Sequence, residues 1–166
     1  MNKQIILFNG PSSSGKSTLA KILQTKIEEK RNEKYVIVSI DDFMKLTTEE
    51  TIYEDDVFEI SGNMCEKVLE ALEISCGVII DHVITSERIF NQLKVMLDQF
   101  DILLVHVTCP LDVLKKREKE RKNRCLGSSE ASYTYLFPKE GYDLTVDTHY
   151  KSLDECCELI YNKIIN

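Results

Sequence analysis

Short apolar runs alternate along the chain with longer stretches in which apolar residues recur at helical spacing. Runs that are apolar at nearly every position are typical of strands buried on both faces of a parallel sheet. Four such runs are present, at Gln4–Asn9, Tyr35–Ile40, Gly77–Asp81 and Asp101–Thr108. A fifth and weaker run spans Tyr142–Asp147. The pattern therefore predicts five parallel strands.

Helices are predicted between these strands. Their expected ranges are Lys16–Arg31, about Ser61–Ser75, Ser86–Gln99, Leu111–Lys122 and Ser152–Ile164. Stripes such as Ile60, Met64, Val68 and Leu72 have the spacing of one helix face, and we assign them to the core. The alternation of strand and helix with short links predicts an α/β doubly wound fold with helices on both faces of the sheet.

Two stretches do not fit this alternation. Residues 44–59, which hold six acidic side chains, follow the second strand, and residues 124–141 precede the last one. Ligands of open α/β sheets bind beyond the carboxyl ends of the strands, and both stretches begin near such ends. We therefore expect them to form the walls of a substrate site.

Length and charge narrow the class of protein. The 166 residues are predicted to form a single domain, and no apolar run is long enough to span a membrane. The net charge of −7 argues against general nucleic-acid binding. The six cysteines include no C-x-x-C pair, so the sequence predicts neither a zinc site nor a disulfide framework. Because there is also no signal-peptide pattern, we expect a cytoplasmic location.

The first strand leads into Gly10-Pro11-Ser12-Ser13-Ser14-Gly15-Lys16-Ser17-Thr18. This is the complete G-x-x-x-x-G-K-[ST] phosphate loop, in its required place between a strand and a helix. The glycines allow successive N–H groups to face the phosphates, and the helix directs its positive end at them. Lys16 is expected to reach the β- and γ-phosphates and Ser17 to ligate Mg²⁺. ATP and Mg²⁺ are the predicted cofactors.

Acidic side chains end two further strands. Asp41 and Asp42 follow the second strand, and Asp81 ends the third as in a Walker B element. Carboxylates at these places bind Mg²⁺ through water or accept a proton from an attacking hydroxyl. Because we expect an extended segment here, Asp41 and Asp42 should point in opposite directions, and which of them faces the acceptor is open.

A basic run follows the fourth strand. Residues 115–124 hold seven basic and two acidic side chains, a local charge of +5 that leaves −12 for the rest of the chain. A continuing helix would place Arg117, Arg121 and Arg124 on one face. Such arginines can close over a nucleotide and neutralise the charge that develops in phosphoryl transfer. Of the histidines, we expect His106 in the core and His82 to be neutral and structural.

The chain resembles the chloramphenicol phosphotransferase-like family of small P-loop kinases. The resemblance covers nearly the whole chain, through IILFNGPSSSGKST at 5–18, SIDDF at 39–43, GVIIDHV at 77–83, VHVTCPLDVLKKREKERKNR at 105–124 and YDLTVDT at 142–148. It implies a P-loop kinase fold with an arginine-rich lid at about 111–141 and transfer of phosphate from ATP to an alcohol of a small molecule. By this resemblance Asp41 is the catalytic base. Residues 128–132 and 136–137 depart from the family pattern on the substrate side.

The resulting hypothesis is an ATP-dependent kinase of a small-molecule alcohol, similar to chloramphenicol phosphotransferase. Its catalytic residues are Lys16, Asp41, Arg121 and Arg124, and Mg²⁺ is held by Ser17 and, through water, by Asp81. The nucleotide is bound by Gly10, Ser12, Ser13, Ser14, Gly15, Lys16, Ser17, Thr18 and Arg117. Two alternatives remain, a P-loop kinase of a nucleoside or sugar-type alcohol and a nucleotide-binding switch protein. The acceptor, the oligomeric state and the pathway are left open.

Overall fold

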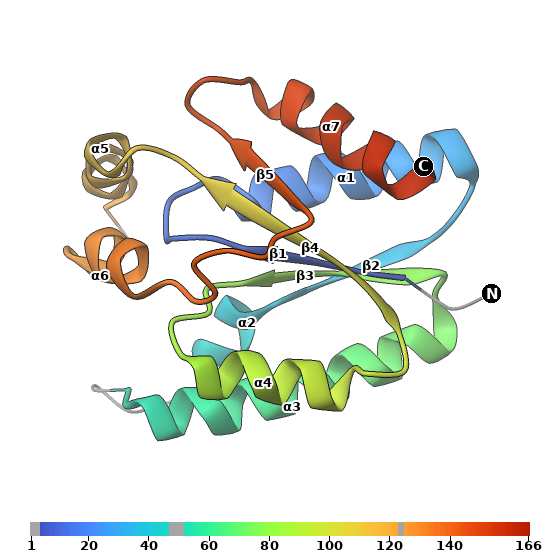
Figure 1. Cartoon of the computed structure of the whole chain (residues 1–166), viewed down its shortest axis with the longest axis horizontal. Coiled ribbons are helices and arrows are strands. Elements are labelled where there is room, and N and C mark those ends of the chain that lie inside the picture. Colours follow the sequence, from blue (N-terminus) through green and yellow to red (C-terminus); the bar gives the residue numbers. More distant parts are fainter. Residues whose placement is uncertain (1–3, 47–51, 123–124) are drawn as a thin grey trace.

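All five predicted strands are present and every neighbouring pair is parallel. The computed structural model describes residues 4–46, 52–122 and 125–166. The strands lie in the order β2-β3-β1-β4-β5, so that β1 is central (Figure 1). Every residue of β3 is buried, as an uninterrupted apolar run predicts for a sheet covered on both faces. The bounds are β1 Gln4–Asn9, β2 Tyr35–Ser39, β3 Gly77–His82, β4 Asp101–Thr108 and β5 Leu144–Asp147.

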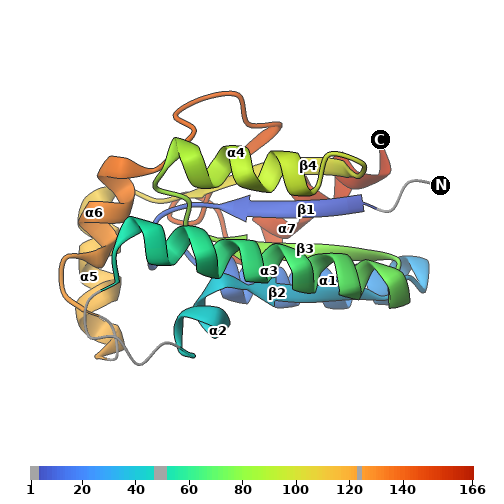
Figure 2. The same cartoon turned by 90° about the horizontal axis from the view of Figure 1, so that it is seen from below.

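Helices cover both faces of the sheet (Figures 1 and 2). Successive side chains of a strand point to opposite faces. Ile5 and Leu7 of β1 accordingly pack in one core cluster with α3 and α4, whereas Ile6 and Phe8 pack in the other with α1 and α7. The helix bounds are α1 Lys16–Arg31, α2 Ile40–Met44, α3 Glu54–Ile74, α4 Glu87–Met96, α5 Leu111–Arg121, α6 Ser128–Tyr135 and α7 Leu153–Ile165.

Two helices were not predicted, and one begins earlier than expected. The short α2 occupies the segment that we expected to be extended, and α6 lies within the stretch 124–141. The third helix begins at Glu54 instead of Ser61, so the last part of the stretch 44–59 is helical. Its start is stabilised by Asp56, which accepts a hydrogen bond of 2.8 Å from the Tyr53 N–H, and by three acids in the first turn. The remaining elements start or end within three residues of their predicted bounds.

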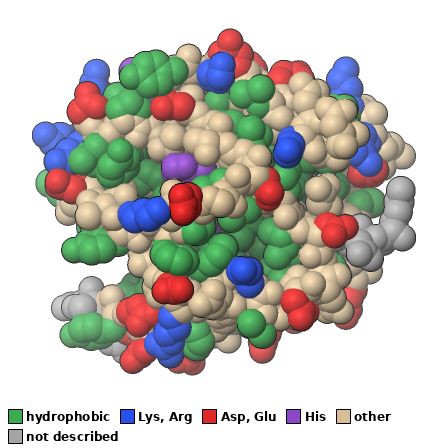
Figure 3. Space-filling view, in the orientation of Figure 1, with side chains coloured by type: hydrophobic (Ala, Val, Ile, Leu, Met, Phe, Trp, Pro, Cys, Tyr) green, Lys and Arg blue, Asp and Glu red, His purple; other side chains and the backbone are tan. Residues whose placement is uncertain are grey.

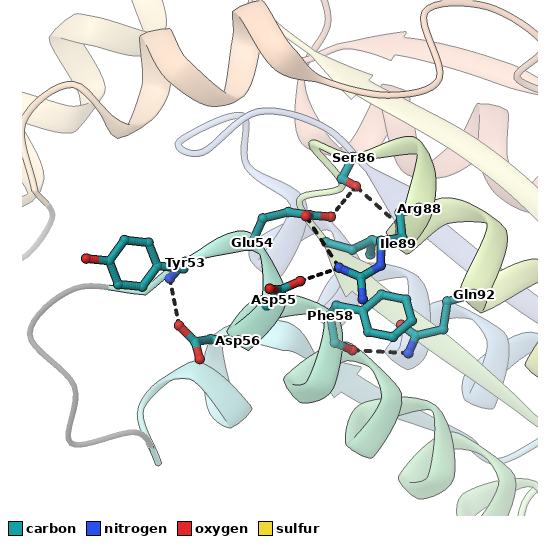
Figure 4. Close-up of polar contacts among 9 residues, drawn as sticks. All are labelled: Tyr53, Glu54, Asp55, Asp56, Phe58, Ser86, Arg88, Ile89 and Gln92. Atoms are coloured by element: carbon teal, nitrogen blue, oxygen red, sulfur yellow. Dashed lines mark hydrogen bonds and ion pairs between the residues drawn. The ribbon is translucent and has the colours of Figure 1, made fainter.

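The beginning of α3 is held against α4 by a polar cluster (Figure 4). Arg88 pairs with Asp55 and Glu54, and its guanidinium carbon lies 3.9 Å from the centroid of the Phe58 ring. Ser86 Oγ, the N-cap of α4, donates to Glu54 at 2.8 Å. This part of the molecule is therefore tied to α4 by side chains that remain at the surface.

The strands run toward the side of the molecule on which α5 and α6 lie (Figure 1). The surface is indented at this end, between the region of α6 and the region where α3 begins (Figure 3). The range 111–141, which the sequence predicts to form a lid, holds two helices, α5 and α6. Among the described residues, no helix has the length and apolar character needed to cross a bilayer.

Candidate active site

The phosphate loop connects β1 to α1 and has the backbone conformation that its sequence predicts. Gly15 has φ +96°, in the left-handed region that glycine adopts without strain. At Gly10 an added Cβ would lie 2.0 Å from the Val107 carbonyl oxygen, so no side chain fits there. Ser13 also has a positive φ, of 71°. The loop therefore makes a tight turn directly before the start of α1.

Lys16 is buried at the mouth of this loop. Its Nζ donates to the Pro11 carbonyl oxygen at 2.9 Å and to Ser14 Oγ at 3.4 Å. The ammonium group is therefore on the side that the loop encloses. In this position it adds a positive charge to the positive end of α1.

The residues present fit a bound phosphate chain. Ser12 Oγ and Ser13 Oγ are buried and have no hydrogen-bond partner among the described residues. Buried hydroxyl groups without partners are uncommon, and an anion beside the loop would satisfy both. The first N–H groups of α1 also have no acceptor within their own helix. Together these donors form a site for an anion with several oxygen atoms.

Ser17 and Asp81 are brought together as predicted for the magnesium side of the site. Ser17 Oγ donates to Asp81 Oδ2 at 2.5 Å, and Ser39 Oγ lies 3.4 Å from the same oxygen. The described residues include no group of three or more His, Cys, Asp or Glu side chains that could hold a metal by themselves. A hydroxyl and one carboxylate instead fit Mg²⁺ that keeps waters and phosphate oxygens as its other ligands.

Asp41 and Asp42 have different surroundings. Because both lie in the helix α2, the expected alternation of an extended segment is wrong, although their side chains still diverge. Asp41 lines the polar cavity beside the loop, whereas the side chain of Asp42 is 70% exposed and lies 3.8 Å from Lys45. Of the two, Asp41 is the one that lines the polar cavity.

The polar cavity collects the main predicted residues from five segments of the chain. Its walls combine the loop and α1 with α2, the end of β3 and the end of α5. It has room for one or two water molecules, about 20 Å³, with the exposed Arg121 at its edge. The residues that line it are Ser12, Ser13, Gly15, Lys16, Ser17, Ile40, Asp41, Asp81, Val83 and Arg121.

The helix that carries Arg117 and Arg121 ends before Arg124. The helix α5 ends at Arg121 because Lys122 adopts the left-handed conformation, with φ 54°. Arg124 lies outside the described residues. Arg117 does not line the cavity; its guanidinium contacts the loop from the outer side, donating to the Ser13 carbonyl oxygen at 3.3 Å and to Thr148 Oγ1 at 3.0 Å.

Several residues that touch the loop were missed in the sequence. Thr148 and two serines of α6, Ser129 and Ser132, each hydrogen-bond to the loop backbone. Glu118 was counted only as part of a charged run, yet it is buried and accepts N–H hydrogen bonds from Ser129 at 2.8 Å and Gly127 at 3.1 Å. Burial alone would raise its pKa, but these hydrogen bonds outweigh that effect and lower the pKa of Glu118.

His82 is buried, as a structural role predicts, whereas His106 is not in the core, where we expected it. His82 is fully buried, and its Nε2 lies 3.1 Å from Ser61 Oγ of α3. Burial, assisted by the charge of Lys16, lowers the pKa of His82 to about 4, so that it is neutral near pH 7. His106 is half-buried and stacks on Tyr142 with ring centroids 4.6 Å apart. Burial and then Lys16 also lower its pKa.

Comparison with known proteins agrees with this arrangement. The family described as chloramphenicol phosphotransferase-like protein matches residues 3–165. The chain belongs to this family. An adenylyl-sulfate kinase of Prochlorococcus marinus is 28% identical over 97% of this chain and 83% of its own length.

Solved structures share the fold at low sequence identity. The APS kinase of Mycobacterium tuberculosis in complex with AMPPNP and APS has a TM-score of 0.78, 16% identity and 99% coverage of both chains. The tunicamycin resistance protein of Deinococcus radiodurans has a TM-score of 0.66 and 17% identity, over 97% of this chain and 95% of its own. The solved structures show the fold, and the family match together with the adenylyl-sulfate kinase relative identifies an ATP-dependent P-loop kinase.

Proposed function

We propose that this member of the chloramphenicol phosphotransferase-like family transfers the γ-phosphate of ATP to a hydroxyl group of a small molecule. The observation that carries the proposal is the polar cavity in which Lys16, Asp41 and Arg121 meet. A cation that grips phosphate, a carboxylate beside it and a second cation on a lid helix are the groups that phosphoryl transfer to an alcohol requires.

Each of these residues has a task in the proposed reaction. Lys16 and the amide groups of the loop bind the β- and γ-phosphates. Asp41 accepts the proton of the acceptor hydroxyl as the hydroxyl oxygen forms its bond to phosphorus and the bond from phosphorus to ADP breaks. Arg121 neutralises the charge that spreads over the equatorial oxygens during transfer. Arg124 is proposed for the same task.

Mg²⁺ is proposed as the second cofactor. When bound, the ion would neutralise charge on the β- and γ-phosphates. Ser17 Oγ is the residue proposed to touch the ion, and Asp81 would hold one of its waters. The distance of 2.5 Å between Ser17 Oγ and Asp81 Oδ2 supports this division of tasks.

The acceptor side is proposed to lie along α2 and the beginning of α3. The helix α2 carries Asp41 into the polar cavity and Phe43 into a second groove of about 270 Å³. Beside apolar side chains and Asn63, this groove exposes the carboxylates of Asp56 and Glu59, and none of the described residues that line it is basic. Such a lining favours a neutral or positively charged alcohol with an apolar part over an anionic one.

A second candidate is phosphorylation of a nucleotide-like alcohol such as adenylyl sulfate. The 28% identity with an adenylyl-sulfate kinase over nearly the whole chain favours this candidate. The two carboxylates in the groove oppose it, because the acceptor would carry negative charge.

The test is ADP release from purified protein with Mg·ATP and a panel of acceptors. The panel contains chloramphenicol, neutral alcohols, amino alcohols, nucleosides and adenylyl sulfate, and product mass reports the gain of one phosphate. We expect stimulation by a neutral or cationic alcohol. Stimulation by adenylyl sulfate alone would support the second candidate instead. ATP binding without any phosphorylated product would contradict both and favour the switch hypothesis.

A further inference from the structure

Three consecutive carbonyl groups of the phosphate loop each accept a hydrogen bond from a side chain in the second half of the chain. Ser129 Oγ donates to the Ser12 carbonyl oxygen at 3.2 Å, and Arg117 donates to that of Ser13 at 3.3 Å. Thr148 Oγ1 donates to that of Ser14 at 2.6 Å. The donors come from α6, from α5 and from the residue after β5, respectively.

These hydrogen bonds fix the direction of the amide groups that follow. In a planar trans peptide the C=O of one residue and the N–H of the next point in opposite directions. A carbonyl group held on the outside of the loop therefore keeps the next N–H on the enclosed side. The Ser14 N–H is an example, since it points across the loop to the Pro11 carbonyl oxygen at 3.3 Å.

Two of the three donors form a connected network. Arg117 donates to both Thr148 Oγ1, at 3.0 Å, and the Thr148 carbonyl oxygen, at 3.2 Å. The Thr148 hydroxyl thus accepts from Arg117 while it donates its own hydrogen to Ser14. Its backbone is fixed as well, because the Thr148 N–H donates to the Thr108 carbonyl oxygen at 3.0 Å. The network joins the sheet to the loop.

The third donor attaches α6 to the same loop. Ser132 Oγ accepts from the Ser12 N–H at 2.9 Å, so α6 binds both backbone groups of Ser12. The helix is in turn anchored to α5 through Glu118, which accepts from the backbone N–H groups of Gly127 and Ser129. Both lid helices therefore contact the outer side of the loop.

We propose that Arg117, Ser129 and Thr148 are positioning residues that hold the phosphate loop open for the anion by fixing three of its carbonyl groups. This inference rests on the proposed function, and it assigns Arg117 a place behind the loop instead of on the nucleotide. Fixing the amide directions before binding removes part of the cost of ordering the loop when phosphate arrives. Loss of one of these bonds should therefore weaken nucleotide binding without disturbing Asp41.

The decisive variants are at Thr148. Thr148→Val keeps the shape and removes the hydroxyl, whereas Thr148→Ser keeps the hydroxyl. We expect Thr148→Val to raise the Kd of Mg·ATP, measured by calorimetry, by about 5- to 10-fold, the loss of one hydrogen bond. Thr148→Ser should stay within about 2-fold of the unsubstituted protein. Thr145→Val, on the exposed side of β5, is the matched control. If Thr148→Val binds Mg·ATP with the same Kd as the unsubstituted protein, the proposal is overturned.

A double-mutant cycle distinguishes positioning from direct contact by Arg117. If Arg117 and Thr148 act through the same loop, their effects on the Kd of Mg·ATP are not independent. The double variant Arg117→Met and Thr148→Val should then raise the Kd by less than the product of the two single increases. If the loss of affinity in the double variant equals the product of the two single losses, Arg117 contacts the nucleotide independently of Thr148. That result would overturn the assignment of Arg117 as a positioning residue.

Two further results keep the test decisive. If Thr148→Val does not fold, Ser129→Ala tests the same idea from α6, and unchanged Mg·ATP binding by Ser129→Ala would count against it. Failure of the unsubstituted protein to bind Mg·ATP would refute the proposed function itself. If the unsubstituted protein and every variant bind Mg·ATP with the same Kd, only the positioning role is refuted.

Discussion

The phosphate side and the acceptor side of the site are built in different ways. On the phosphate side, the loop and Lys16 are buried, and side chains from three other segments hold the loop backbone. On the acceptor side, a five-residue helix and the beginning of α3 line a groove whose Leu46 is 79% exposed and whose Glu59 is also exposed. One side is fixed before a ligand arrives, and the other presents side chains to solvent.

This difference separates the reaction from its specificity. Phosphoryl transfer requires donors and charges at fixed positions, and errors of about 1 Å cost large factors in rate. Acceptor recognition requires only a surface of suitable shape and charge beyond those donors. The phosphate side should therefore tolerate little change, whereas substitutions in the groove should change which alcohol is used more than how fast phosphate is transferred.

The largest effect is expected at Lys16. Lys16→Ala should lower the rate of phosphoryl transfer by about 10³-fold or more, because it removes the charge that binds the transferred phosphate. Lys21→Ala is the matched control, since Lys21 is exposed on the same helix and away from the cavity. The measurement is ADP release at saturating acceptor. Full activity of Lys16→Ala would remove the basis for placing ATP at this loop.

A smaller loss is expected at the boundary between the two sides. Asp41→Asn should lower kcat by about 10²-fold and leave the Kd of Mg·ATP nearly unchanged, because it removes a general base and no phosphate ligand. Asp42→Asn, on the same helix but exposed, should keep normal activity. If Asp41→Asn instead weakens Mg·ATP binding and keeps kcat, Asp41 belongs to the metal side.

The contact between α3 and the sheet should also respond to pH. The helix α3 meets the sheet at the Ser61–His82 pair. Burial lowers the pKa of folded His82 to about 4 from 6.5, so the unfolded chain binds the proton more readily between these values. The stability contributed by neutral His82 is complete above pH 6.5 and is lost as the pH falls.

The expected loss is about 1 kcal/mol in the free energy of unfolding between about pH 6.5 and 5.5. His106, whose pKa is lowered in the same direction, adds to it. Urea unfolding of His82→Gln should show a flatter pH dependence than the unsubstituted protein over this interval. An identical dependence would show that another group is responsible.

The same contrast explains how much the sequence could predict. The loop, β1 and α1 were predicted with their observed bounds because a local motif determines them. The helix α2 was missed since five residues are too few to show a helical period. The contacts of Thr148 and Ser132 with the loop join residues 134 and 120 positions apart, and no local pattern indicates such a pairing. Geometry was needed to find them.

The smallest effect is expected at Glu59 in the acceptor groove. Glu59→Gln removes one exposed charge, which is worth a factor of about 2 to 5 in binding at low salt. It should raise KM by that factor for an amino alcohol and leave KM for a matched neutral alcohol unchanged. Glu66→Gln, exposed farther along α3, is the control. An equal change in KM for both alcohols would mean that the Glu59 carboxylate shapes the groove and does not select the charge of the acceptor. An unchanged KM for both would mean that the acceptor binds elsewhere.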